Sequence, residues 1–157
     1  ANQRGLDPEK VRFETCPFET CEGAGTYDAV VGSSILHHLE IQPALERIFE
    51  LLKPGGYMAF GEPNMLNPHI AVIKNIKWIG RRLGESEDET AFVRWAFANM
   101  LRDIGFVEVS VQPVEWLHPM TPKALVPLMQ AATGVLERIP LIREIGGSLT
   151  ISARKLL

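Results

Sequence analysis

The residues best suited to chemistry are two adjacent histidines and a short acidic segment. His37 and His38 follow one apolar run, and Glu62-Pro63-Asn64 follows another. A neutral imidazole can accept a proton from a hydroxyl or an amine near pH 7. The alternative is that one histidine caps or packs beside a helix while the other is solvated, because no carboxylate stands at a spacing that identifies it as a partner. Glu62 and Asn64 could face a substrate, or Pro63 could simply fix a turn.

The elements that position these residues alternate between short apolar runs and amphipathic segments, as in βαβ units. Residues 27–32 form a continuous apolar run of the kind found in buried parallel strands. Residues 41–52 carry apolar side chains at helical spacing, and the proline and glycines of 53–56 end that helix. A second strand is expected over 57–61.

The C-terminal part continues this rhythm. The pattern predicts a helix over about 89–104, a strand from residue 107, a helix over 122–139 and a last strand over 149–153, and residues 11–13 could form a short strand near the start. The side chains expected to point inward from the 89–104 helix are Phe92, Trp95, Ala96 and Met100.

An ordered set of motifs carries a family resemblance. The chain contains the segment YDAVVGSSILHHL at 27–39, then LKPGGY at 52–57, then EPN at 62–64. At these spacings the chain resembles the class I S-adenosylmethionine-dependent methyltransferases over nearly its whole length. In an open parallel sheet, ligands bind outside the carboxyl ends of the strands. The resemblance therefore implies a binding site after the 27–32 strand.

The resemblance also implies which residues contact the cofactor. Gly32, Ser33 and Ser34 would border its methionine part, although the same residues could form an ordinary loop with a serine cap. Pro17 and Phe18 occupy the places that flank the adenine in the family. Phe18 could stack on the base, or it could be a core aromatic.

The fold implied is α/β: an incomplete Rossmann-like methyltransferase sheet, comprising the family's strands 3 to 7, with helices on both faces. Residues 1–157 would form a single partial domain with helical insertions at about 64–88 and 115–145. No counterpart of the family's glycine-rich cofactor loop precedes the first strand. The chain is therefore expected to be a C-terminal portion of the domain.

The family's strand order, 3-2-1-4-5-7-6, implies an exposed edge at the 27–32 strand. An uncovered apolar edge is a pairing hazard. We expect self-association there, closure by an N-terminal half, or rearrangement of the first part of the chain.

The expected insertions carry apolar side chains interleaved with lysines and arginines, over 70–82 above all. Three interpretations stay open: a lid for a hydrophobic or lipid-linked acceptor, peripheral contact with a membrane, or an extra core layer.

The function implied is methyl transfer from S-adenosylmethionine to a small-molecule acceptor, with His37 or His38 accepting a proton. The alternative is a non-catalytic, truncated scaffold or interaction subunit.

Composition excludes other classes. The formal net charge of −3 argues against a nucleic-acid binder that works by bulk charge. Cys16 and Cys21 are too few for a disulfide scaffold, and the four histidines show no metal-ligand spacing, so no metal site is expected. No apolar run is long enough to cross a bilayer. A cytoplasmic location is the simplest expectation.

Overall fold

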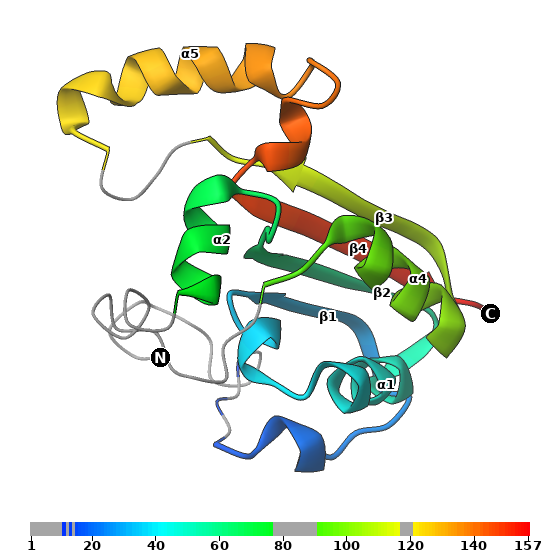
Figure 1. The fold of residues 1–157 in the computed structure, drawn as a ribbon. Helices are drawn as coiled ribbons and strands as arrows, with labels where there is room; N and C mark the ends of the chain where they lie inside the picture. The colour runs from blue at the N-terminus through cyan, green and yellow to red at the C-terminus, as the bar shows by residue number, and fades with distance from the viewer. Residues whose placement is uncertain (1–10, 12, 14, 77–90, 117–120) are drawn as a thin grey trace.

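The computed structural model describes residues 11, 13, 15–76, 91–116 and 121–157. Within these residues a four-stranded sheet has the order β1-β2-β4-β3 (Figure 1). Strands β1 (Tyr27–Ser33) and β2 (Leu52–Pro63) are parallel, whereas β4 (Ser148–Lys155) runs antiparallel to both β2 and β3 (Phe106–Val114). This order corresponds to strands 4-5-7-6 of the predicted family sheet, and β1 is an edge of the described sheet. Val11 and Phe13 lie in no strand, so the short strand expected at 11–13 is not found.

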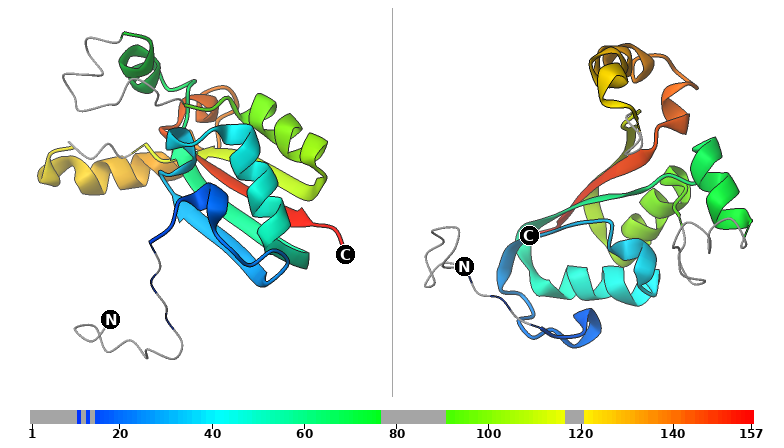
Figure 2. Two further views of the ribbon diagram at one scale, coloured as in Figure 1. Left: turned by 90° about the horizontal axis from the view of Figure 1, so that it is seen from below. Right: turned by 90° about the vertical axis from the view of Figure 1, so that its left-hand side faces the viewer.

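Helices α1 (Ile41–Leu51) and α4 (Arg94–Ile104) cover one face of the sheet (Figure 2). The core lies between them and the strands, where Ile48 and Leu101 pack with Met58 and Ile151. On the opposite face of the described sheet, Val31 is 72% exposed, and Tyr57 is also exposed. The α/β fold class is confirmed, while the expected helices on both faces are found on one face only within the described residues.

Helix α4 begins later than predicted, and its buried face differs from the predicted one. The backbone of Phe92 bonds to the end of β2 and to the segment after it, donating to Pro63 and accepting from Met65, so the helix starts only at Arg94. Phe97, Ala98 and Leu101 are buried, whereas Trp95 is 52% exposed. The prediction that Trp95 and Ala96 point inward is therefore wrong. The hydrogen bonds of Phe92 to another part of the chain fix where the helix begins, and this determines which of its side chains face the core.

Helices α2 (Pro68–Asn75) and α5 (Val126–Leu136) fall in the two segments expected to be insertions. They are joined to the rest by the turns η4 (Lys123–Leu125) and η5 (Arg143–Ile145) and by residues 65–67. Neither helix has a buried residue, and α5 projects beyond the ends of the strands (Figure 1). These two helices therefore do not form an extra core layer, which is one of the three interpretations left open by the sequence.

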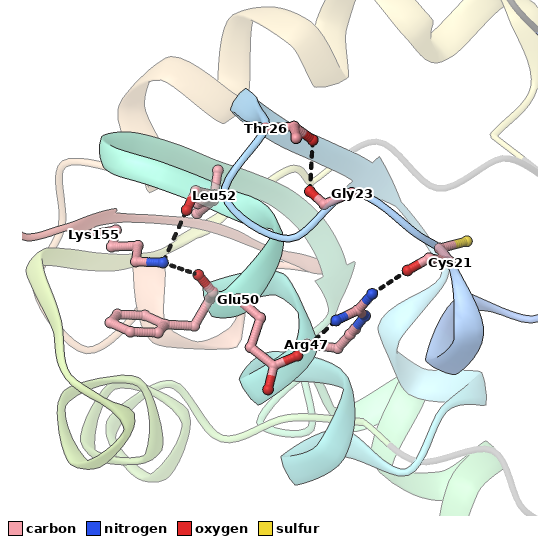
Figure 3. Close-up of polar contacts among 8 residues, drawn as sticks. Cys21, Gly23, Thr26, Arg47, Glu50, Leu52 and Lys155 are labelled. Atoms are coloured by element: carbon pink, nitrogen blue, oxygen red, sulfur yellow. Dashed lines mark hydrogen bonds and ion pairs between the residues drawn. The ribbon is translucent and has the colours of Figure 1, made fainter.

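Polar contacts hold the chain together at the amino ends of β1 and β2 (Figure 3). The Lys155 ammonium donates to the carbonyls of Phe49 and Leu52, at 2.8 and 2.9 Å, which satisfies two acceptors at the C-terminal end of α1. Arg47 of α1 bonds the carbonyl of Cys21 and pairs with Glu50. These bonds fix the segment that leads into β1 against α1.

Candidate functional site

The carboxyl ends of β1 and β2 bring the predicted site residues to one edge. Ser33, the last residue of β1, lies opposite Gly61 of β2. The backbone N–H of Ser34 then donates to the Gly61 carbonyl at 2.8 Å, and the short 3-10 helix η3 (Leu36–His38) follows. Because the two strands are parallel, Glu62 at the end of β2 lies beside this turn.

Glu62 is the most densely bonded side chain of the edge. Its residue is 1% exposed. Oε1 accepts from the backbone N–H groups of Ile35 and Leu36, at 3.0 and 2.9 Å. Oε2 accepts from the backbone N–H of His37 at 3.4 Å and lies 2.8 Å from Nδ1 of the His37 ring. The carboxylate thus meets the free N–H groups at the start of η3, as a capping residue does.

His37 and His38 differ in environment. His37 is 7% exposed and paired with Glu62, whereas His38 is exposed. The two rings lie 4.0 Å apart between centroids. The carboxylate partner that no sequence spacing revealed is therefore Glu62, 25 residues further along the chain. The available signal was topological: both residues follow apolar runs, and parallel strands end at the same edge.

Asn64 is also buried, at 1% exposure. Its Nδ2 donates to the carbonyls of Glu144 and Gly146, both at 2.8 Å, and its Oδ1 accepts from the backbone N–H of Leu66 at 3.1 Å. Asn64 therefore joins the end of β2 to the segment that leads into β4.

That Glu62 and Asn64 contact a substrate stays a prediction, and the structure shows another role for both side chains. Both side chains are buried, and their polar atoms are bonded to other parts of the chain. A buried polar group needs such partners because desolvation without them is costly. Their role is to position the surrounding backbone.

Gly32 has a packing role that the sequence did not reveal. A Cβ placed at this residue would lie 2.6 Å from Cε1 of Phe60 and 3.0 Å from Cγ2 of Ile35. The close approach that Gly32 permits is therefore to the Phe60 ring. Its contact with a cofactor stays a prediction.

Ser33 and Ser34 are exposed at the edge. Ser34 has a φ of +53°, in the left-handed region that residues other than glycine rarely adopt. Residues held in sparsely populated backbone conformations cluster at binding and catalytic sites. The two hydroxyls can bond an ammonium or a carboxylate.

Pro17 and Phe18 precede β1 in the sequence, and the segment that contains them lies beside α1. Phe18 opens the 3-10 helix η2 (Phe18–Thr20), is partly buried and packs against the core. Pro17 is exposed, and its carbonyl accepts from the backbone N–H of Thr20. The structure thus favours the core interpretation of Phe18 that the sequence left open.

Within the described residues, no cluster of three or more histidine, cysteine or acidic side chains could hold a metal ion. No described helix combines the length and the apolar character needed to cross a membrane.

Comparison with known proteins relates part of the chain to a family. Residues 1–60 match the model of the methyltransferase domain. An alignment over 89 residues, which covers 54% of this chain, is 32% identical to part of the probable polyketide synthase 14 of Dictyostelium discoideum and covers 3% of that protein.

Solved structures extend the likeness over the fold. A SAM-dependent methyltransferase of Thermotoga maritima, described as a possible histamine N-methyltransferase, aligns with a TM-score of 0.61 at 17% identity, over 88% of this chain and 60% of that one. A Haloferax volcanii structure of a methyltransferase with its Trm112 activator aligns with a TM-score of 0.65 at 17% identity, over 99% and 66%. The phosphoethanolamine N-methyltransferase 2 of Haemonchus contortus, solved with S-adenosylmethionine, aligns with a TM-score of 0.54 at 14% identity, over 90% and 36%.

The chain has the α/β fold of the SAM-dependent methyltransferases. The resemblance predicted from the sequence is confirmed: residues 1–60 match the methyltransferase domain model, and the described residues have the fold of SAM-dependent methyltransferases. The chain spans 3% of the curated relative and less than two thirds of the Thermotoga and Haemonchus chains.

Proposed function

We propose that this chain supplies one wall of the active site of an S-adenosylmethionine-dependent methyltransferase that acts on a small-molecule acceptor. The observation that carries the proposal is the His37–Glu62 pair, which lies directly after the exposed Ser33–Ser34 turn at the carboxyl edge of parallel strands. This edge is where open α/β sheets bind ligands. The methyltransferase model match and the bound cofactor of the Haemonchus relative support the same assignment.

The residues present fit part of such a cofactor site. The exposed hydroxyls of Ser33 and Ser34 suit the ammonium and carboxylate of an amino-acid group. The N–H groups at the start of η3 are taken by Glu62 and are closed to a ligand. Gly32 would contribute its backbone, and Pro17 and Phe18 would contribute only their exposed surfaces. S-adenosylmethionine, when bound, supplies the electrophilic methyl group.

In this proposal His37 handles the proton. An acceptor hydroxyl or amine must lose its proton as the new bond to the methyl carbon forms and the bond from that carbon to sulfur breaks. Nδ1 of His37 faces Glu62, which leaves Nε2 as the atom that receives the proton. His38, which is exposed, could bond the acceptor or the solvent. Methyl transfer depends mainly on positioning, so a small set of residues suffices.

We extend the proposal to an apolar acceptor, including a lipid-linked one. Helices α2 and α5 follow and precede strand ends at the same side of the sheet, and they expose Val72, Leu128 and Val135. Leu128 is 65% exposed. Exposed apolar side chains offer a surface that an apolar ligand can bind. The likeness to a stretch of a polyketide synthase supports a small organic acceptor.

Isothermal titration with S-adenosylhomocysteine tests the cofactor part of the proposal. We expect saturable binding, weakened about tenfold by Ser33→Glu because the added carboxylate repels that of the ligand. Gln112→Glu, an equally exposed change on β3, is the matched control and should bind as the parent does. Absence of heat with the parent protein contradicts the cofactor site.

A second candidate function is that of a non-catalytic interaction subunit. It is favoured by β1, which is an edge of the described sheet and exposes Val31. An open apolar edge strand is a template for pairing with another chain or copy. Light scattering should then show self-association that Val31→Lys abolishes, together with no binding of S-adenosylhomocysteine. A monomer that binds the ligand rejects this candidate.

A further inference from the structure

We propose that Glu62 is a positioning residue that links the Ser34 turn to the protonation of the His37 ring, so that the cofactor wall and the base form one unit. This inference rests on the function proposed above. It concerns a residue whose predicted role is substrate contact and whose carboxylate is bonded to other residues of the chain.

The first support is the complete use of the Glu62 carboxylate. It accepts from three consecutive backbone N–H groups and from one ring nitrogen. A carboxylate removed from water is costly unless N–H donors replace its hydration. Here four groups from residues 35–37 do so. The carboxylate therefore holds this segment in one arrangement rather than serving a ligand.

The second support is the strained residue next to that segment. Ser34 has a φ of +53°. Its own N–H bonds the Gly61 carbonyl, and the N–H of the next residue, Ile35, bonds Glu62. A left-handed residue other than glycine persists only where its surroundings over-determine it. Gly61 and Glu62, adjacent on β2, therefore impose the turn on which the proposed cofactor contacts lie.

The third support is the direction of the His37–Glu62 hydrogen bond. Oε2 already accepts the backbone N–H of His37, and an ionised carboxylate can only accept. Nδ1 must therefore donate across the 2.8 Å contact. In the neutral ring the proton then resides on Nδ1 and Nε2 is free to accept one. Nε2 makes no hydrogen bond to any other residue in the part of the chain that the structure describes.

The substitution Glu62→Gln distinguishes the effect of the Glu62 hydrogen bonds from the effect of its side-chain size. Glutamine has nearly the same size, but one oxygen acceptor is replaced by an N–H donor. If that donor faces His37, Nδ1 must become an acceptor and the ring proton moves to Nε2. Nε2 then carries a proton and can no longer accept one from the acceptor, while the ring stays in place.

The test uses ¹⁵N-labelled histidine in the parent protein, in Glu62→Gln and in the matched control Glu50→Gln, whose carboxylate is 60% exposed. In the parent and in the control, the ring nitrogen shifts of His37 should report a protonated Nδ1 and an unprotonated Nε2. In Glu62→Gln the assignment should reverse. The Leu36 amide should also exchange with solvent about tenfold faster, because its acceptor is weakened.

Binding of S-adenosylhomocysteine completes the test. We expect an affinity about tenfold lower in Glu62→Gln and unchanged in Glu50→Gln, since only the former loosens the Ser34 turn. A parent ring with its proton on Nε2 overturns the inference without any variant. So does a Glu62→Gln protein that keeps the parent tautomer and affinity.

Failure of the proposed function gives a different result. A parent protein that binds no S-adenosylhomocysteine but shows the expected tautomer and its reversal would reject the cofactor site and keep the role of Glu62 in positioning His37.

Discussion

The two ends of the β1–β2 pair are held together in different ways. At the carboxyl end, buried Glu62 and Asn64 make several hydrogen bonds each, and the strained Ser34 directly precedes the residues that Glu62 bonds. At the amino end, Lys53 and Asp28 form an exposed ion pair. Lys155 bonds the carbonyls of Phe49 and Leu52 (Figure 3). The contacts at the amino end only hold neighbouring segments together, whereas those at the carboxyl end maintain a conformation that the backbone would not adopt by itself. Stored strain and buried charge at one end are consistent with a site there.

The largest effect is expected at Asn64. Asn64→Leu should cost about 3 kcal/mol of unfolding free energy, because the part-buried carbonyl of Glu144 and the buried carbonyl of Gly146 both lose their donor. Urea unfolding measures it. Asn75→Ala, which removes a local bond on exposed α2, should stay within about 0.5 kcal/mol of the parent. Equal losses in the two variants would contradict the distinction between the ends.

Gly32→Ala should cost about 2 kcal/mol, because the new methyl group would lie 2.6 Å from the buried Phe60 ring. Thermal and urea unfolding of the single variant, of Phe60→Leu and of the double variant form a cycle. The double variant should lose less than the sum of the singles. Strict additivity would show that the glycine serves something other than Phe60.

At the amino end, Lys155→Gln should cost about 1 kcal/mol. The ammonium bonds two carbonyls at the C-terminal end of α1 and lies 4.7 Å from the centre of the Phe49 ring. Affinity for S-adenosylhomocysteine should not change, since the carboxyl edge is untouched. If Lys155→Gln lowered the affinity without lowering the stability, the amino end would also take part in binding, and the proposed difference between the two ends would be wrong.

The smallest effect is expected for Asp28→Asn. Its ion pair with Lys53 spans 2.8 Å, but the two side chains are 87% and 45% exposed. Exposed pairs contribute about 0.5 kcal/mol or less. Unfolding in low and in high salt should be nearly the same for the variant and the parent. A cost above about 1 kcal/mol would mean that the amino end is more tightly coupled than its exposure indicates.

The sequence by itself determined the class of fold and the edge at which the site lies. The apolar run of β1, the stripe of α1 and the order of the motifs around 27–64 are local patterns, and period and spacing are written directly in the residues. The position of β1 at an edge of the described sheet also follows from the strand order that the family resemblance implies.

Only the tertiary structure decided what the polar residues at that edge do. Glu62 and His37 are 25 residues apart, and their contact depends on the register of β1 against β2, which no local pattern contains. For the same reason, the partners of Asn64 could not be read from the sequence: Glu144 and Gly146 lie 80 and 82 positions further along the chain. The buried face of α4 likewise depends on Phe92 bonding the chain after β2. Hydrogen-bond partners and burial are properties of the assembled sheet, so the residue types could indicate chemistry there but not which atoms remain free to perform it.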